Sequence, residues 1–83
     1  MDYQNVQYPA YEKDADIQGK VFVRFVIQPD GSVDQVQVVR GVSKGLDKEA
    51  ARVVSAMPRW NPGKQGGRAV PVYFNLPINF VLN

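Results

Sequence analysis

Alternating side chains near the end of the chain limit its fold more than any other feature. In RAVPVYFNLPINFVLN, residues 68–83, every even-numbered position after Arg68 is apolar. These positions are Val70, Val72, Phe74, Leu76, Ile78, Phe80 and Leu82. The odd-numbered positions that carry polar groups are Tyr73, Asn75, Asn79 and Asn83. Alternation at a period of two predicts a strand with one buried face.

Pro71 and Pro77 indicate where this strand lies in its sheet. A proline has no N–H to donate, so within a sheet it is found at an edge or a bulge. Residues of one parity direct their N–H and C=O groups to the same side of a strand, and both prolines are odd-numbered. We therefore predict that the odd-numbered residues face an open edge, while the even-numbered residues hydrogen-bond to a neighbouring strand. An open edge can accept a segment of another chain as an added strand.

A hairpin is predicted in the first half of the chain. Residues 20–28 carry an apolar side chain at every odd-numbered position, and Phe22 and Val26 add apolar groups to the opposite face. Apolar groups on both faces favour a central strand. Residues 29–32, Pro-Asp-Gly-Ser, predict the turn, because Pro fixes φ and Gly accepts a positive φ. Residues 32–40 then return as the second strand.

Residues 46–57 predict an amphipathic helix that ends before Pro58. The apolar stripe expected to face the core consists of Leu46, Ala50, Val53, Val54 and Met57. The polar side chains expected on the opposite, solvent-facing side are Asp47, Lys48, Glu49 and Arg52. A stripe at this spacing is typical of a core helix rather than of a binding groove.

The order strand, strand, helix, strand predicts an α+β fold. The crossover brings the last strand beside the first, which gives a three-stranded antiparallel sheet in the order 2-1-3. One main helix packs on one face of this sheet, so the architecture is a two-layer sandwich. Residues 1–19 are expected to form an N-terminal arm, with helical turns over residues 10–17 and Pro9 at the first helical position. Residues 20–83 form the domain itself.

The segment between the helix and the last strand carries two further predictions. Trp60 is expected to fold back onto the end of the sheet as a lid. Gly63–Gly67 is expected to be a flexible hinge. Beside an open edge, such a hinge predicts that the last strand can swap into a second copy, forming a homodimer at high concentration.

Catalysis and metal binding have little support in the residues. The chain contains no cysteine and no histidine, which removes thiol chemistry, disulfides and the commonest general base. The acidic pairs are Asp14 with Asp16, Asp30 with Asp34, and Asp47 with Glu49. A turn, a helix start and a solvated segment account for them, so we predict no enzyme, no cofactor and no metal site. Phe22 and Arg24 on an outer sheet face leave a nucleic-acid module as an alternative.

Three motifs resemble the C-terminal domain of the TonB family of energy transducers. They are Tyr8-Pro9, Pro29-Asp30-Gly31 within GKVFVRFVIQPDGSVDQVQVVRG, and Trp60 followed by Pro62-Gly63-Lys64. They occur in the order and spacing of the family, and the resemblance covers nearly the whole chain. The ending Leu76-Pro77-Ile78-Asn79-Phe80 is similar to versions from Bacteroidetes-type bacteria.

The resemblance implies a periplasmic domain of an inner-membrane-anchored protein, with the anchor and a proline-rich spacer absent from this chain. Its expected partner is the TonB-box peptide of outer-membrane TonB-dependent transporters, added as a strand parallel to the last strand. The missing N-terminal part would contact the inner-membrane complex that uses the proton gradient. The implied contact residues are Asn5, Gln7, Tyr8, Pro9, Val72, Tyr73, Phe74, Asn75, Asn79 and Val81. The alternative is a TonB-like or TolA-like periplasmic module of a membrane signalling protein.

Overall fold

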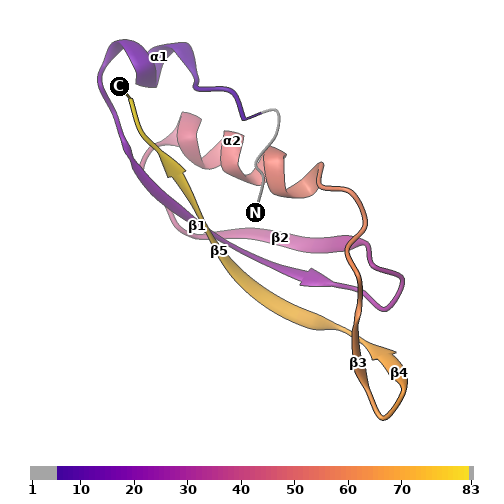
Figure 1. The fold of residues 1–83 in the computed structure, drawn as a ribbon. Coiled ribbons are helices and arrows are strands. Elements are labelled where there is room, and N and C mark those ends of the chain that lie inside the picture. Colours follow the sequence, from indigo (N-terminus) through magenta and orange to yellow (C-terminus); the bar gives the residue numbers. More distant parts are fainter. Residues whose placement is uncertain (1–5, 83) are drawn as a thin grey trace.

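The computed structural model describes residues 6–82 of the chain. In chain order its elements are α1 (Ala10–Asp14), β1 (Gly19–Ile27), β2 (Val33–Arg40), α2 (Lys44–Ser55), β3 (Gly63–Gln65), β4 (Arg68–Val70) and β5 (Val72–Phe80). Figure 1 shows α2 lying across one face of a twisted sheet, with the β3–β4 hairpin projecting beyond it. Neither described helix has the length and apolar character needed to cross a bilayer.

β1, β2 and β5 form the main sheet in the order β2-β1-β5. Both neighbours of β1 run antiparallel to it. α2 packs against β2 and β1 on one face of this sheet (Figure 1). The predicted α+β class, the central first strand and the edge position of the last strand are all confirmed.

The core lies between α2 and the sheet. Its buried cluster consists of Val21, Val23, Phe25, Ile27, Leu46, Ala50, Val54, Ile78 and Phe80. Every odd-numbered side chain from Val21 to Ile27 points into this cluster and is at most 1% exposed. Burial of such side chains contributes roughly 1.5–3 kcal/mol each, so this cluster is the main source of stability.

α2 begins and ends two residues earlier than predicted. Ser43 is its N-cap, and the Ser43 hydroxyl accepts a hydrogen bond from the Leu46 N–H at 3.3 Å. A capping serine satisfies one of the free N–H groups at a helix start, so the helix begins at Lys44. Pro58 disfavours helical backbone at the residue before it, and the helix accordingly ends at Ser55 rather than Met57.

The stretch predicted as a single strand over residues 68–83 is two strands, so that prediction was wrong. β4 pairs with β3, whereas β5 pairs with β1. Pro71 separates them where the pairing partner changes. Gly66 and Gly67 have φ values of 58° and 77°, which suit a two-residue hairpin turn. The predicted flexible hinge at Gly63–Gly67 is therefore part of a regular hairpin.

The even-numbered face of β5 is buried only toward the end of the strand. Ile78 and Phe80 are 1% and 2% exposed, whereas Phe74 is 39% exposed. α2 packs on β1 and β2 and leaves the first half of β5 without a helical cover. The prediction of one uniformly buried face was therefore too simple.

Candidate functional site

β5 is a regular strand with one edge available. Nine consecutive residue pairs join it to β1, from Gly19 opposite Phe80 to Ile27 opposite Val72, without a register shift. Within residues 6–82, no strand pairs with its other edge. A regular edge strand presents a row of backbone donors and acceptors that an extended chain can use.

Pro77 indicates which residues of β5 face this edge. It lies opposite Phe22 in the unbroken register. In an antiparallel pair, hydrogen-bonded and non-hydrogen-bonded positions alternate, and a proline fits the second kind because it has no N–H. The residues of the same parity, Tyr73, Asn75 and Asn79, are then the ones whose N–H and C=O groups face the edge. All three side chains are exposed, Tyr73 by 68%.

An aromatic group supports the first half of β5. The Phe74 ring stacks on the Phe25 ring, with centroids 5.7 Å apart, and the Trp60 ring lies 5.3 Å from Phe74. The Trp60 N–H donates a hydrogen bond to the Gly31 carbonyl at 2.8 Å, which ties the segment after α2 to the β1–β2 turn. The predicted lid position of Trp60 is confirmed, and this lid supports the strand from the α2 side.

The N-terminal arm lies against α2 and the end of β5, not along the edge at Tyr73 and Asn75. The Tyr8 ring packs edge-on against Phe80 at 5.6 Å, and the Tyr8 hydroxyl donates a hydrogen bond to the Ile17 carbonyl. Burial, with Asp16 and Glu12 adding to it, raises the pKa of Tyr8, so the hydroxyl remains a donor. Pro9 is the N-cap of α1 rather than its first residue, because its backbone is extended.

Two other predicted contact residues lie outside this arrangement. Asn5 is outside the described residues. Val81 follows the end of β5 and is 59% exposed, so it does not belong to the strand that was expected to include it. The structure thus gathers Val72, Tyr73, Phe74, Asn75 and Asn79 on one strand and places Gln7, Tyr8 and Pro9 on a separate surface.

A sequence model described as Gram-negative bacterial TonB protein C-terminal matches residues 4–82. The chain belongs to this family. "Protein TonB" of Escherichia coli (strain K12) is 40% identical over 73 residues, covering 84% of this chain and 30% of that protein. "Protein tonB2" of Pseudomonas aeruginosa is 32% identical over 79 residues, covering 93% and 28%. The chain therefore spans less than a third of the length of these curated relatives.

Solved structures of the same family share the fold. The solution NMR structure of the Pseudomonas aeruginosa TonB CTD has a TM-score of 0.72 and 27% identity, covering 99% of this chain and 83% of that chain. An NMR structure of the Helicobacter pylori TonB-CTD has a TM-score of 0.70 and 25% identity, covering 94% and 70%. These matches confirm the resemblance drawn from the sequence, in both family and fold.

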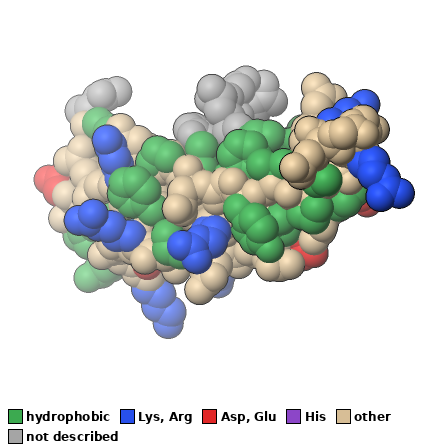
Figure 2. Space-filling model, turned by 90° about the horizontal axis from the view of Figure 1, so that it is seen from below, with side chains coloured by type: hydrophobic (Ala, Val, Ile, Leu, Met, Phe, Trp, Pro, Cys, Tyr) green, Lys and Arg blue, Asp and Glu red, His purple; other side chains and the backbone are tan. Residues whose placement is uncertain are grey.

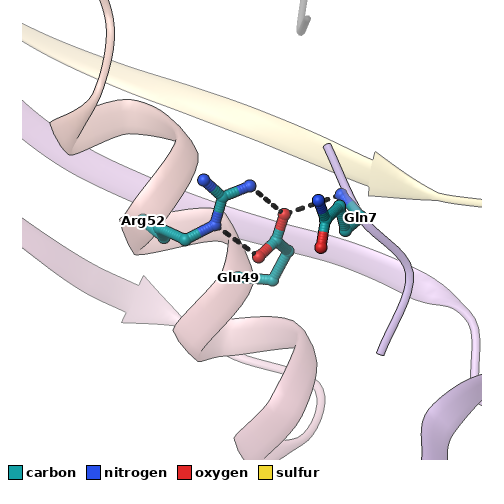
Figure 3. Close-up of polar contacts among 3 residues, drawn as sticks. All are labelled: Gln7, Glu49 and Arg52. Atoms are coloured by element: carbon teal, nitrogen blue, oxygen red, sulfur yellow. Dashed lines mark hydrogen bonds and ion pairs between the residues drawn. The ribbon is translucent and has the colours of Figure 1, made fainter. Parts of the chain in front are cut away.

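Sequence patterns did not predict the hydrogen bonds that attach the N-terminal arm to α2. Glu49, predicted on the solvent side of α2, is only 9% exposed. Its carboxylate accepts two hydrogen bonds from Arg52, at 2.8 and 2.7 Å, and one from the Gln7 N–H at 2.7 Å (Figure 3). The Arg52 hydrogen bonds lower the pKa of Glu49, with the Gln7 N–H adding to the effect. The solvent-facing prediction for Glu49 was wrong because the arm covers that side of the helix.

Glu12 is a second buried carboxylate, 4% exposed, that no local pattern indicated. One of its oxygens accepts hydrogen bonds from the Ser43 hydroxyl at 2.9 Å and the Gly45 N–H at 2.8 Å. It therefore caps the start of α2 from another helix, and a side chain at Gly45 would collide with it. These partners lie more than thirty positions away, so helical spacing around Glu12 carries no sign of them.

Other acidic side chains in the described part of the chain have local structural roles. No group of three or more acidic residues within residues 6–82 could hold a metal ion. Asp30 accepts hydrogen bonds from the Ser32 N–H and hydroxyl, which lower the pKa of Asp30 and close the hairpin turn. Asp47 accepts from the Val42 N–H at 2.8 Å. These carboxylates organise turns and helix ends.

Proposed function

We propose that this domain is the partner-binding end of a TonB-type transducer in the periplasm. On this view the edge of β5 pairs with the TonB-box peptide of an outer-membrane transporter. Force derived from the inner-membrane proton gradient, arriving through the N-terminal part of the full protein, is delivered through that contact. The observation that carries the proposal is the unbroken, unbulged register of β5 with β1, while no strand within residues 6–82 pairs with its far edge.

The positions of the prolines set the expected register of the added strand. Pro71 precedes β5 and Pro77 interrupts its odd-numbered donors, so Tyr73 and Asn75 supply the central pair of N–H groups. Main-chain pairing depends little on peptide side chains, which would let one transducer serve several transporters. A single added strand buries little surface, so the contact should be weak and readily released.

The arm would add selectivity rather than main-chain pairing. The Gln7 N–H and the Tyr8 hydroxyl are already used within the domain. The Gln7 side chain is exposed and borders a hollow of about 420 Å³ that also includes Pro9, Lys48 and Arg52. This surface offers polar side chains to residues that flank the paired segment of a partner.

The decisive experiment titrates the ¹⁵N-labelled domain with TonB-box peptides and compares Asn75→Pro with Asn75→Ala. Proline deletes one edge-facing N–H, whereas alanine keeps the N–H and removes only the side chain. We expect Asn75→Pro to weaken binding about tenfold or more while Asn75→Ala binds nearly as the parent does. A folded Asn75→Pro domain that binds with the parental affinity would show that the edge of β5 is not the site.

A second measurement uses the unmodified domain, in case the proline variant does not fold. Peptides carrying a single N-methyl group at successive positions should lose affinity at every other position. Residues of one parity point their N–H groups at β5, and those of the other parity do not. Equal sensitivity at all positions would count against strand addition.

A further inference from the structure

The face of the sheet opposite α2 carries cations that have no acidic partner among residues 6–82. Because the odd-numbered side chains of β1 enter the core, its even-numbered ones, including Lys20, Phe22 and Arg24, lie on this opposite face. Neither Lys20 nor Arg24 forms an ion pair with any residue in the range 6–82. Figure 2 views the molecule from this side, with blue side chains spread among green ones.

A bulge in β2 adds two more groups to the same face. The register passes from Phe22 opposite Arg40 to Val23 opposite Val38, so Val39 is an extra residue in β2. A bulge of this kind places two neighbouring side chains on one side of the strand. Val39 and Arg40 therefore both lie beside Phe22, while Val38 packs toward the core.

These groups surround a shallow apolar hollow. Phe22, Val39 and Pro77 supply its apolar lining, and Arg40 and Asn75 complete it, with a volume of about 370 Å³. The Arg40 guanidinium lies 5.9 Å from the centre of the Phe22 ring. Arg24 is paired with Asn75 across β1 and β5, so a second cation stands next to the same hollow. Its volume lies toward the small end of the range for ligand sites, which is roughly 300–1,000 Å³.

We propose that this outer hollow, lined by Phe22, Val39, Arg40, Asn75 and Pro77, docks an acidic segment of a partner protein through one protruding apolar side chain. The apolar side chain fills the hollow, and neighbouring carboxylates pair with Arg24, Arg40 and Lys20. This surface is a sheet face, separate from the backbone edge of β5, so it does not depend on strand addition.

Charge and shape favour this occupant over the alternatives. A second copy of the domain would bring the same cations together. Within the described strands, the one acidic side chain on this face is Asp34, opposite Val26 at the far end of the face. A membrane surface is entered by protruding apolar groups, whereas Phe22 lies in a hollow and is half-buried. Stacked bases need an open aromatic face, and Arg40 stands over the ring of Phe22.

The test uses a capped heptapeptide with one phenylalanine between two acidic triplets, titrated into the ¹⁵N-labelled domain. We expect amide shifts centred on Phe22, Arg24, Val39 and Arg40, and an affinity that falls with added salt. The double variant Arg24→Glu/Arg40→Glu should weaken binding by about tenfold. Lys44→Glu, a charge reversal at an exposed position on α2, should leave the affinity within about twofold, since α2 lies on the opposite face of the sheet.

Four further probes distinguish the possible sources of the signal. Replacing the central phenylalanine by serine should weaken binding, since the hollow is then unfilled. A heptapeptide with lysine triplets, an oligothymidylate and phosphatidylglycerol vesicles should each bind more weakly than the acidic peptide. Equal or tighter binding of any of these three, or shifts confined to residues 72–79, would overturn the proposal.

Discussion

The two outer strands of the sheet, β2 and β5, are both edges, but only β5 is suited to accept a new strand. β5 keeps one register with β1 over its whole length. β2 changes register with β1 twice, once near each end. Gln35 in β2 also has a φ of 53°, far from extended backbone. Bulges twist an edge away from regular pairing, so β2 is protected from added strands while β5 stays open.

The two edges also differ in which of their backbone N–H groups are free to pair. The Asp34 carboxylate accepts a hydrogen bond from the Gln35 N–H at 2.8 Å, so a donor in the irregular part of β2 is already satisfied. On β5 no strand within residues 6–82 pairs with the outer edge, and Pro77 restricts which donors that edge offers. The two edge strands of the same small sheet therefore differ in their ability to pair with an added strand, and only β5 has the regular backbone that such pairing needs.

The largest expected effect is on stability, compared between one apolar side chain of each edge strand. Phe80→Ala should destabilise the domain by about 3–5 kcal/mol, because it leaves a large cavity in the core under Tyr8. Val38→Ala in β2 should cost only about 1 kcal/mol, since Val38 is half-buried. Urea unfolding of both variants checks this ranking. Equal losses would show that the strand proposed to take a peptide is no better anchored than its counterpart.

The next largest effect is expected for the contact between the N-terminal arm and α2, which lies away from both edges. Glu49→Gln should cost about 1–2 kcal/mol, because the carboxylate accepts hydrogen bonds from Arg52 and Gln7. The folded-state pKa of Glu49 is depressed below 4.5, so its contribution is fully present above that pH and is lost as the pH falls through the folded-state pKa. Thermal melts from pH 7 to 3 should therefore show a shallower acid dependence for Glu49→Gln than for the parent. Parallel curves would contradict this role.

A smaller effect tests the irregularity of β2 itself. Gln35→Gly should stabilise the domain by about 0.5–1 kcal/mol, because glycine adopts a positive φ without steric cost. Gln35→Val should be destabilising, since a β-branched side chain is disfavoured there. Differential scanning calorimetry of the pair provides the check. If valine were tolerated as well as glycine, the left-handed backbone at Gln35 would not be a feature of the domain in solution.

The smallest expected effect is self-association through β5. The regular edge of β5 predicts a minor dimer population at millimolar concentration, and Asn75→Pro should remove it. Sedimentation velocity over a concentration series measures this population. A strictly monomeric parent at millimolar concentration would count against an edge that other chains can use, whereas a dimer that persists in Asn75→Pro would assign association to another surface.

Local patterns predicted the elements that depend on side-chain periodicity. The alternating residues of β1 and the α2 stripe were found because each faces a single core. The Pro29–Ser32 turn was found because Pro and Gly indicate a turn from local sequence alone. The proline parity correctly placed the last strand at the edge of the sheet. Backbone that depends on distant partners was not predicted, as in the break at Pro71, where the pairing changes from β3 to β1.

The positions of the proposed contact residues were predicted only in part for the same reason. Alternation predicted the strand that carries Val72 through Asn79, and the family resemblance implied that this strand contacts a partner. The structure places these residues on one edge strand. The arm positions Gln7 and Tyr8 came from a family motif, and their internal hydrogen bonds to Glu49 and Ile17 have no local signature. Buried carboxylates such as Glu12 are satisfied by residues far along the chain, which periodicity does not reveal.

The central claim, that the edge of β5 and not that of β2 takes the peptide, is tested most directly by isotope-filtered NOE spectroscopy. The labelled domain is mixed with an unlabelled TonB-box peptide, and cross-strand contacts between backbone protons are recorded. The account predicts contacts from the peptide backbone to Tyr73 and Asn75, repeating at alternate residues, and none to Gln35 or Gln37. Backbone contacts to β2, or contacts only to side chains of α2 and the arm, would contradict it.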